Sequence, residues 1–293
     1  MDYDVVIIGA GPAGLSAAVY LRRAGMNVAI IEKQSFSGGQ ILLTGSVENY
    51  LGFPSITGDA LADRFYKHAK WLGTDFIEGE VSAIDNHTVR LKNFKSIRAE
   101  IIVLAMGSTH KTLGLKNEKE LNGKGISYCA LCDGNFFKNR KVAVIGGGDT
   151  ALEDAIYLSS ICSSVTLIHR RDKLKGSKIL QDKFFRMPNT HLLFNDEVRE
   201  FKGDKRLKAL VLKSGQELTV DGAFISIGQN PQNELVRGKV RLDTQGYIIT
   251  DEYCRTSLHK VFAVGDIRSK NCRQIVTAVA DGAIVTKGIM ETI

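Results

Sequence analysis

The stretch YDVVIIGAGPAGLSAAVYLRRAGMNVAIIE, residues 3–32, decides how this chain folds. An apolar run leads into a glycine-rich turn that contains Gly9, Gly11 and Gly14, and the pattern then changes to that of a helix. A second apolar run follows and ends at Glu32. This order of strand, turn, helix and strand predicts a βαβ unit with its glycine turn at the amino end of the helix.

A second stretch, KVAVIGGGDTALEDAIYLSSICSSVTLIHRR at residues 141–171, has the same order. Its glycine turn contains Gly146 and Gly148, with Ala151 where the first stretch has a third glycine. This internal repeat predicts an α/β chain with two Rossmann-like, three-layer nucleotide-binding domains, each built on a parallel sheet.

Each glycine turn suits the pyrophosphate of a dinucleotide, because the backbone can approach the phosphates at the amino end of the following helix. The residue at the end of the next strand then distinguishes the ligands. Glu32 can accept a hydrogen bond from a ribose 2′-hydroxyl and would repel a 2′-phosphate. The second unit has a basic cluster at that place, made of His169, Arg170, Arg171 and Lys175. Such a cluster suits a 2′-phosphate, although a solvated basic loop has the same composition, and we expect FAD in the first unit and NADPH in the second.

The length of 293 residues exceeds that of a typical single domain, so two domains are expected. Polar stretches after the apolar run 101–107 and at Gln229–Pro231 are candidate crossings between them. We therefore predict a nucleotide-binding domain inserted into a discontinuous flavin-binding domain. The predicted bounds are 1–113 for the first part of the FAD domain, 114–235 for the NADPH domain and 236–293 for the second part of the FAD domain.

Composition and charge argue against several classes of protein. The chain has 39 Lys and Arg against 32 Asp and Glu, a net charge of +7, yet it has no basic block or nucleic-acid motif. No apolar run approaches the roughly 18 residues of a membrane span, and the sequence enters a strand where a signal region would lie. Cys162, Cys254 and Cys272 are isolated, which does not suit the disulfide framework of a secreted protein. We expect a cytoplasmic protein that binds neither nucleic acid nor membrane, with an acidic protein partner left open.

Cys129 and Cys132 form a Cys-x-x-Cys pair that is followed directly by Asp133 and Gly134. Such a pair is half of a zinc site, a redox disulfide or a coincidence. Zinc needs two further ligands, and the sequence has no second Cys pair or His pair at structural spacing, so no metal is predicted. The redox interpretation needs a source of electrons, which a flavin with NADPH supplies. Asp133 would then handle the proton, unless it is only a turn residue before Gly134.

A series of motifs stands in the order typical of one family: GAGPAG (9–14), GGQ (38–40), VENY (47–50), CALCDG (129–134), GGGDTA (146–151), HRRD (169–172) and the closing VFAVGDI, RQIVTA and DGA (261–283). By these motifs the chain resembles the low-molecular-weight, bacterial-type thioredoxin reductases of the class II pyridine nucleotide-disulfide oxidoreductases. The resemblance covers essentially the whole length of the chain.

The resemblance implies which residues hold the two cofactors. Those implied to lie along FAD are Gly9, Gly11, Pro12, Ala13, Gly14, Glu32, Lys33, Gly39, Gln40, Asn49, Val81, Gly107, Gly265, Asp266, Arg273, Gln274 and Ile275. Those implied to hold NADPH are Gly146, Gly148, Asp149, Thr150, His169, Arg170, Arg171 and Lys175. The last three FAD residues open the closing helix, whose partly positive amino end would favour negative charge on the flavin.

The resemblance also implies a reaction and a partner. Hydride passes from NADPH to FAD, electrons pass to the Cys129–Cys132 disulfide, and the dithiol reduces oxidised thioredoxin or a thioredoxin-like protein. Cys132 would lie nearer the flavin, Cys129 would attack the partner disulfide, and the protein would be a homodimer. This sequence departs from the family at Lys175, where Arg is usual, and at Leu131, where a small polar residue is usual.

Three alternatives remain at the level of sequence. A flavin-dependent dithiol oxidase would not need the basic cluster of the second unit. A ferredoxin-linked reductase of the same type would lack the second glycine turn, which is intact here. A flavoprotein that acts as a redox sensor or binding module would leave Cys129 and Cys132 without turnover.

Overall fold

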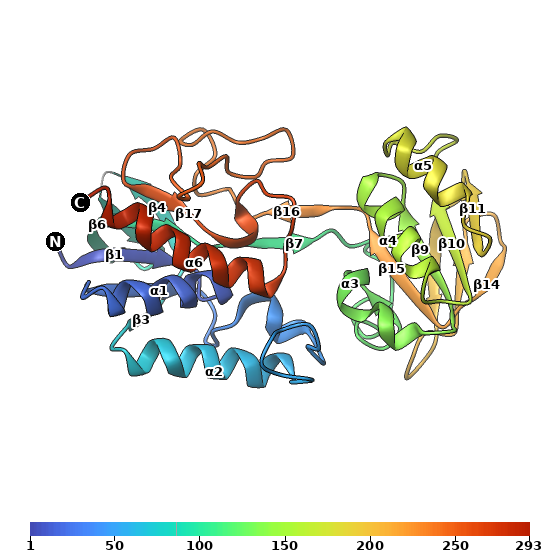
Figure 1. Ribbon diagram of the computed structural model, residues 1–293, viewed down its shortest axis with the longest axis horizontal. Helices are drawn as coiled ribbons and strands as arrows, with labels where there is room; N and C mark the ends of the chain where they lie inside the picture. Colours follow the sequence, from blue (N-terminus) through green and yellow to red (C-terminus); the bar gives the residue numbers. More distant parts are fainter. Residues whose placement is uncertain (86) are drawn as a thin grey trace. The chain divides into compact units, whose positions relative to one another are not determined.

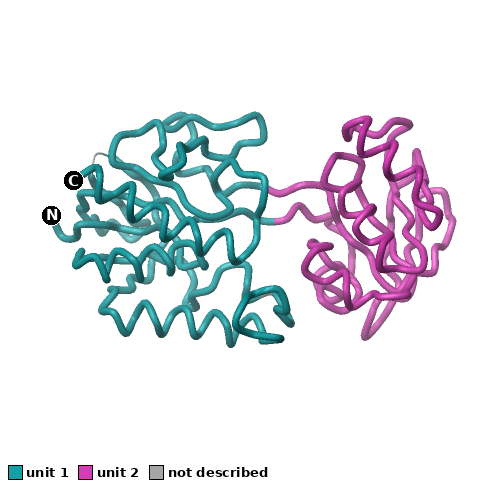
Figure 2. The backbone as a smooth tube through the Cα atoms, viewed as in Figure 1, with its two compact units in different colours: residues 1–109, 230–293 teal, residues 110–229 magenta. Residues whose placement is uncertain are grey.

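The computed structural model describes residues 1–85 and 87–293. Its contacts divide the chain into two compact units (Figure 2). Unit 1 comprises residues 1–109 and 230–293, and unit 2 comprises residues 110–229. Both units are α/β with a parallel sheet, which is the fold class expected from the two βαβ repeats.

The chain crosses between the units at 109/110 and 229/230, a few residues before the boundaries expected from the sequence at 113/114 and 235/236. Side-chain packing accounts for these positions. Leu113 packs against the core of unit 2, and Val236 is buried in the core of unit 1. The short strands β7 (Ser108–His110) and β16 (Gln229–Pro231) pair where the chain crosses.

Parallel strands form the centre of the sheet in unit 1, in the order β3, β2, β1, β6 and β17. β1 is buried on both faces because its alternate side chains pack into two different apolar clusters, and this explains its continuous apolar run. The first residues of β6 pair with an antiparallel hairpin formed by β4 and β5. The strands are β1 (Tyr3–Ile8), β2 (Val28–Glu32), β3 (Asp75–Glu78), β4 (Val81–Asp85), β5 (Thr88–Leu91), β6 (Ser96–Leu104) and β17 (Val261–Ala263).

Helices α1 (Pro12–Arg23) and α6 (Ile275–Met290) lie side by side on one face of this sheet, and α2 (Gly58–Trp71) packs against α1 (Figure 1). α1 begins where the sequence predicts, with Pro12 at its first turn after Gly11. The short 3-10 turns η1 (Gly39–Leu43) and η3 (Gly265–Ile267) complete this part of unit 1.

The sheet of unit 2 is parallel throughout, in the order β11, β10, β9, β15 and β8. Helices α4 and α5 cover one of its faces, and the antiparallel strands β12, β13 and β14 cover the other. The strands are β8 (Ile126–Ser127), β9 (Lys141–Gly146), β10 (Ser164–His169), β11 (Thr190–Phe194), β12 (Val198–Lys202), β13 (Ala209–Leu212), β14 (Glu217–Thr219) and β15 (Gly222–Ser226). The helical segments are α3 (Ala130–Asp133), η2 (Gly134–Phe137), α4 (Asp149–Ser159) and α5 (Lys178–Phe185).

A helix that crosses a bilayer must be both long and apolar. Within residues 1–85 and 87–293, no helix meets both requirements.

Candidate active site

The glycines in the turn of unit 1 have two different roles: two of them allow close packing, and the third leaves space for a ligand. A Cβ atom added to Gly9 would lie 2.5 Å from the Ala105 carbonyl oxygen, and one added to Gly14 would lie 2.1 Å from the Gly9 carbonyl oxygen. Gly9 therefore lets the turn approach the segment that follows β6, and Gly14 lets α1 pack closely on the end of β1. A Cβ atom on Gly11 would meet nothing within 4 Å, which leaves open space at the amino end of α1. The arrangement is the one that a bound pyrophosphate requires.

Glu32 at the end of β2 supports this turn. Its Oε2 accepts a hydrogen bond from the Ala10 backbone N–H at 2.8 Å, and its Oε1 accepts one from the Gln34 N–H at 3.1 Å. A carboxylate has about four acceptor positions, so capacity remains for a ribose hydroxyl. Lys33 beside it is exposed.

Further predicted residues converge on the same turn. A Cβ atom on Gly39 would lie 3.3 Å from the Gly11 Cα, and one on Gly265 would lie 2.7 Å from the Ala13 Cβ. Gly265 follows β17, so these residues gather at the carboxyl ends of parallel strands, where open α/β sheets bind their ligands.

Three other predicted FAD residues lie in unit 1. Gln40 donates a hydrogen bond from Nε2 to the Ser108 carbonyl oxygen at 2.7 Å, which fixes η1 against the start of β7. Gly107 has a φ of +68°, and a side chain there would meet nothing within 4 Å. Val81 is half-buried at the start of β4 and packs against the core.

Asp266 and Arg273 each carry a buried polar atom, Oδ1 and Nε respectively, without a hydrogen bond in the described part of the chain, although Lys270 Nζ lies 3.9 Å from the Asp266 Oδ1. Burial raises the pKa of the Asp266 carboxyl above its ordinary value. An unsatisfied buried polar group is costly, so these atoms fit a site that a polar ligand completes. The glycine cradle and these atoms together fit the pyrophosphate and polyol chain of FAD.

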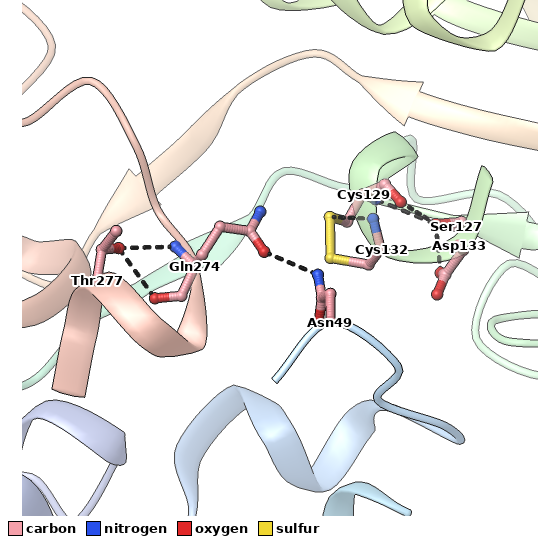
Figure 3. Close-up of a disulfide and its surroundings, with 7 residues drawn as sticks. All are labelled: Asn49, Ser127, Cys129, Cys132, Asp133, Gln274 and Thr277. Carbon is pink, nitrogen blue, oxygen red and sulfur yellow. Dashed lines mark hydrogen bonds between the residues drawn. A yellow bond between two sulfur atoms is a disulfide. The ribbon is translucent and has the colours of Figure 1, made fainter. Parts of the chain in front are cut away.

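Side chains cap the amino end of α6. Gln274 precedes the helix and forms a reciprocal capping box with Thr277, and Asn49 donates from Nδ2 to the Gln274 Oε1 at 3.2 Å (Figure 3). Ile275 is the first residue of the helix and packs in a small apolar cluster with Ile41 and Leu61. The cap orients the helix N–H groups, whose partial positive charge favours a ligand that accumulates negative charge.

The glycine turn of unit 2 repeats the pattern of the first. A Cβ atom on Gly146 would lie 2.4 Å from the Ser226 carbonyl oxygen, whereas one on Gly148 would meet nothing within 4 Å. Between them, a Cβ atom on Gly147 would lie 2.2 Å from His169 Nδ1. This position therefore requires glycine because the imidazole fills the space beneath the turn.

The residues of unit 2 that were predicted to bind NADPH differ in how far they are exposed to solvent. His169 is buried, with Nε2 3.0 Å from the Lys173 carbonyl oxygen, so its ring supports the turn from inside. The cations Arg170, Arg171 and Lys175 are exposed and available to a phosphate. Asp149 and Thr150 at the start of α4 are also exposed, and Asp149 Oδ1 accepts a hydrogen bond from the Ser177 N–H at 2.6 Å.

Cys129 and Cys132 form a disulfide across the short helix α3 (Figure 3). The Cys132 N–H donates a hydrogen bond to Cys129 Sγ at 3.2 Å. Ser127 is a residue that sequence reasoning missed. Its Oγ accepts from the Cys129 N–H at 3.0 Å and donates to Asp133 Oδ2 at 2.6 Å, so one hydroxyl connects the disulfide backbone to the carboxyl.

The environment of Asp133 suits proton transfer. Burial raises the pKa of its carboxyl above the ordinary value, and the hydrogen bond from Ser127 offsets only part of this rise. A carboxyl with a raised pKa next to a redox disulfide can hold a proton and release it. Within the described part of the chain, no group of His, Cys, Asp and Glu could hold a metal ion.

The isolated cysteines are expected to differ in reactivity. Burial raises the pKa of the Cys162 thiol to about 11 and that of the Cys254 thiol to about 12, whereas Cys272 is exposed. Because the thiolate is the reactive form, a chromogenic disulfide reagent should modify Cys272 in the oxidised native protein and the other two only after unfolding. Cys272→Ser should abolish the native reaction. Rapid modification of this variant before unfolding would contradict the expectation.

Asp154 in α4 should make stability depend on pH. Its Oδ2 accepts a hydrogen bond from Ser226 Oγ at 2.5 Å, and burial raises its pKa to about 6. The unfolded value is about 3.9, so the folded state binds the proton more tightly between these values. This group's contribution to the free energy of unfolding is therefore full below about pH 4. It falls, by at most about 3 kcal/mol, as the pH rises through about 6.

Asp154→Asn removes this titration and keeps an acceptor for Ser226. The variant should be more stable than the wild type at pH 8 by about 1–3 kcal/mol and no more stable at pH 4, as measured by urea unfolding. Asp182 forms an exposed ion pair with Lys178 in α5, so Asp182→Asn is the matched control. It should leave the free energy of unfolding unchanged at both pH 8 and pH 4. Equal pH profiles for Asp154→Asn and the wild type would refute the assignment.

Comparison with known proteins agrees with this site. Residues 3–282 match the family described as pyridine nucleotide-disulphide oxidoreductase. A thioredoxin reductase of Listeria innocua is 43% identical, with 96% of this chain and 91% of that protein covered. A thioredoxin reductase of Bacillus subtilis is 40% identical, with coverages of 98% and 93%.

A solved structure shows the same likeness. The crystal structure of thioredoxin reductase from Streptococcus pyogenes matches with a TM-score of 0.92 and 38% identity, covering 99% of this chain and 97% of that one. Sequence, fold and the Cys129–Cys132 disulfide thus agree. This chain belongs to the pyridine nucleotide-disulphide oxidoreductase family, and within it to the low-molecular-weight thioredoxin reductases.

Proposed function

We propose that the chain is an NADPH-dependent thioredoxin-disulfide reductase that binds FAD. The observation that carries this proposal is the Cys129–Cys132 disulfide, joined through Ser127 to a half-buried Asp133 whose pKa is raised. The overall reaction consumes NADPH, one proton and a thioredoxin disulfide, and it yields NADP⁺ and a thioredoxin dithiol. When bound, FAD supplies a carrier that accepts hydride from the nicotinamide and returns two electrons to a disulfide.

The residues of unit 1 would hold FAD. The open space beside Gly11 and the amino end of α1 suit its pyrophosphate, and Glu32 suits its adenosine ribose. Asp266 and the capped amino end of α6 suit the remaining polar groups. The residues proposed to line FAD are those that the resemblance implies in unit 1.

The disulfide-exchange step uses residues of unit 2. The thiolate of Cys129 would attack the thioredoxin disulfide, forming a mixed disulfide and expelling a thiolate from the partner. Cys132 would then attack the mixed disulfide at Cys129, which releases the partner dithiol and restores the internal disulfide. The Cys132 N–H donates to the Cys129 sulfur, and Asp133, whose pKa is raised, would give a proton to the departing sulfur.

The exposed cations of unit 2 should decide the nucleotide preference. Replacing Arg170 and Arg171 by alanine should lower kcat/KM for NADPH by about 100-fold, because two charge-assisted contacts to the 2′-phosphate are lost. The value for NADH should stay within about two-fold, because NADH has no such phosphate. Lys205→Ala, at a site outside the basic cluster, controls for the loss of charge. Equal losses for both nucleotides would contradict the assignment.

We also propose a cytoplasmic homodimer with thioredoxin or a thioredoxin-like protein as its partner. The names of the relatives support the partner. Exposed apolar side chains along α6, namely Val276, Ile284 and Met290, support self-association. Light scattering coupled to size-exclusion chromatography tests the dimer, since a single species of 32.1 kDa would contradict it.

An anaerobic titration tests the function as a whole. NADPH is added to the purified flavoprotein, flavin absorbance is followed, and oxidised thioredoxin is then added. Bleaching by NADPH, weak bleaching by NADH and reoxidation by thioredoxin are expected. Bleaching by a dithiol alone, with reoxidation only by oxygen, would favour an oxidase. Bleaching only by reduced ferredoxin would favour the ferredoxin-linked alternative.

A further inference from the structure

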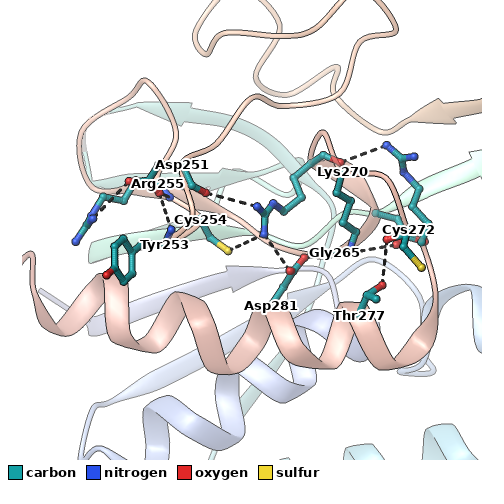
Figure 4. Close-up of polar contacts among 12 residues, drawn as sticks. Asp251, Tyr253, Cys254, Arg255, Gly265, Lys270, Cys272, Thr277 and Asp281 are labelled. Carbon is teal, nitrogen blue, oxygen red and sulfur yellow. Dashed lines mark hydrogen bonds and ion pairs between the residues drawn. The ribbon is translucent and has the colours of Figure 1, made fainter.

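Helix α6 carries a buried carboxylate that none of the steps above uses. Asp281 is 5% exposed and accepts three hydrogen bonds (Figure 4). Its Oδ2 accepts from the Gly265 backbone N–H at 2.8 Å and from Lys270 Nζ at 3.0 Å. Its Oδ1 accepts from Arg268 Nη1 at 2.9 Å. One carboxylate therefore faces two cations and one backbone donor.

The two cations are themselves largely buried. The Lys270 side chain is 12% exposed and the Arg268 side chain 14% exposed. Arg268 also donates to Cys254 Sγ at 3.1 Å, and Lys270 Nζ lies 3.9 Å from Asp266 Oδ1. Removing the charge of Asp281 would leave Lys270 with the more distant Asp266 and would take the ion pair of Arg268 away, at side chains with little access to solvent, which is costly.

Close packing of α6 on α1 fixes the position of Asp281. A Cβ atom on the next residue, Gly282, would lie 2.5 Å from the Ala17 backbone nitrogen, so the two helices approach each other at this turn. Gly265 has a φ of +75° and lies against Ala13 of the same α1 helix. The contact between Asp281 and the Gly265 N–H therefore joins a rigid helix pair to the turn that begins η3.

We propose that Asp281 is a positioning residue for the flavin. Its carboxylate holds the Gly265–Asp266 turn in the conformation that binds FAD. Arg268 binds the other carboxylate oxygen, Oδ1, and Lys270 binds Oδ2 together with the Gly265 N–H. Asp281 acts through Gly265, while Asp266, whose Oδ1 makes no hydrogen bond among the described residues, is the group left to meet the ligand. The inference rests on the proposed function, because it concerns the FAD site of that enzyme.

The test measures FAD affinity on two variants and one control. Asp281→Asn keeps the size and one acceptor oxygen but loses the charge, and Asp281→Ala loses both. Glu291→Gln is the matched control, because Glu291 caps the other end of α6 in an ion pair with Arg255 and is 43% exposed. The apoproteins are titrated with FAD, whose fluorescence changes on binding, at a temperature where circular dichroism shows each to be folded.

The expected results form a series. The dissociation constant of FAD should rise about 10-fold for Asp281→Asn, about 100-fold for Asp281→Ala and less than about two-fold for Glu291→Gln. A role in stability alone would lower the unfolding temperature of the apoproteins and leave these constants unchanged. Wild-type affinity in both folded Asp281 variants would overturn the proposal. Failure of the wild-type apoprotein to bind FAD would instead overturn the proposed function.

A second measurement covers the case in which Asp281→Ala does not fold. Glycine-selective ¹⁵N labelling reports the exchange of the Gly265 amide proton with solvent. Slow exchange in the wild-type holoprotein and exchange at least about ten-fold faster in Asp281→Asn are expected, because the charged acceptor is replaced by a weaker neutral one. Equal exchange rates in the two proteins would show that Asp281 does not hold this turn.

Discussion

Replacing Cys129 with serine is expected to lower kcat/KM for thioredoxin reduction by at least about 1,000-fold, while NADPH still reduces the bound flavin. A serine hydroxyl is not ionised near neutral pH and forms no disulfide, so neither the internal disulfide nor the exchange step can occur. Steady-state reduction of thioredoxin measures the disulfide exchange, and anaerobic bleaching of the flavin measures its reduction by NADPH. Cys272→Ser, at an exposed isolated cysteine, is the control and should keep most of the activity.

Comparison with Cys132→Ser tests the role of each cysteine. If Cys129 attacks the partner, then Cys132→Ser leaves an attacking thiol without the thiol that resolves the mixed disulfide. A covalent complex with thioredoxin should then accumulate and be visible on a non-reducing gel. Cys129→Ser should form little of this complex. Accumulation in Cys129→Ser and not in Cys132→Ser would reverse the assignment, and full thioredoxin reduction by either variant would contradict the proposed function.

The two βαβ units could be predicted from sequence because their determinants are local. The strand, glycine turn and helix of residues 3–32 are set by an apolar run, by Gly9 and Gly14 and by Pro12 at the first turn of the helix. Several elements of unit 2, among them α5, β11 and β12, were not predicted. The helix α5 is short, and the strands β11 and β12 show no strict alternation of buried and exposed residues, so no period marks them.

The candidate site was predictable only in part, for a related reason. Gly11 and the Cys129–Cys132 pair belong to motifs, whereas Ser127 is a lone hydroxyl that becomes important through its contacts with Cys129 and Asp133. His169 is basic in sequence and suggested a phosphate ligand, but the fold buries its ring beneath Gly147. The Ser127 contacts are local, but they depend on the irregular backbone around α3, which no period of the sequence marks. The place of His169 depends on tertiary packing, which the local pattern does not encode.

Gly14→Ala and Gly11→Ala are expected to fail in different ways. The methyl group of Gly14→Ala would lie 2.1 Å from the Gly9 carbonyl oxygen, a backbone atom that cannot move aside without separating α1 from β1. We expect a loss of at least about 3 kcal/mol in the free energy of unfolding, and a protein that is poorly soluble or lacks flavin. Urea unfolding of the apoprotein, followed by circular dichroism, measures this loss.

Gly11→Ala should keep the fold and lose the ligand. Gly11 has a φ of −76°, which alanine adopts readily, and its new methyl group would meet no protein atom within 4 Å. The free energy of unfolding of the apoprotein should change by less than about 1 kcal/mol, mainly through the weaker helix cap. The dissociation constant of FAD should rise about 100-fold, because the methyl group enters the space proposed for the pyrophosphate. Unchanged FAD affinity in the folded variant would place the pyrophosphate elsewhere, and equal destabilisation by both substitutions would mean that the space beside Gly11 is not open.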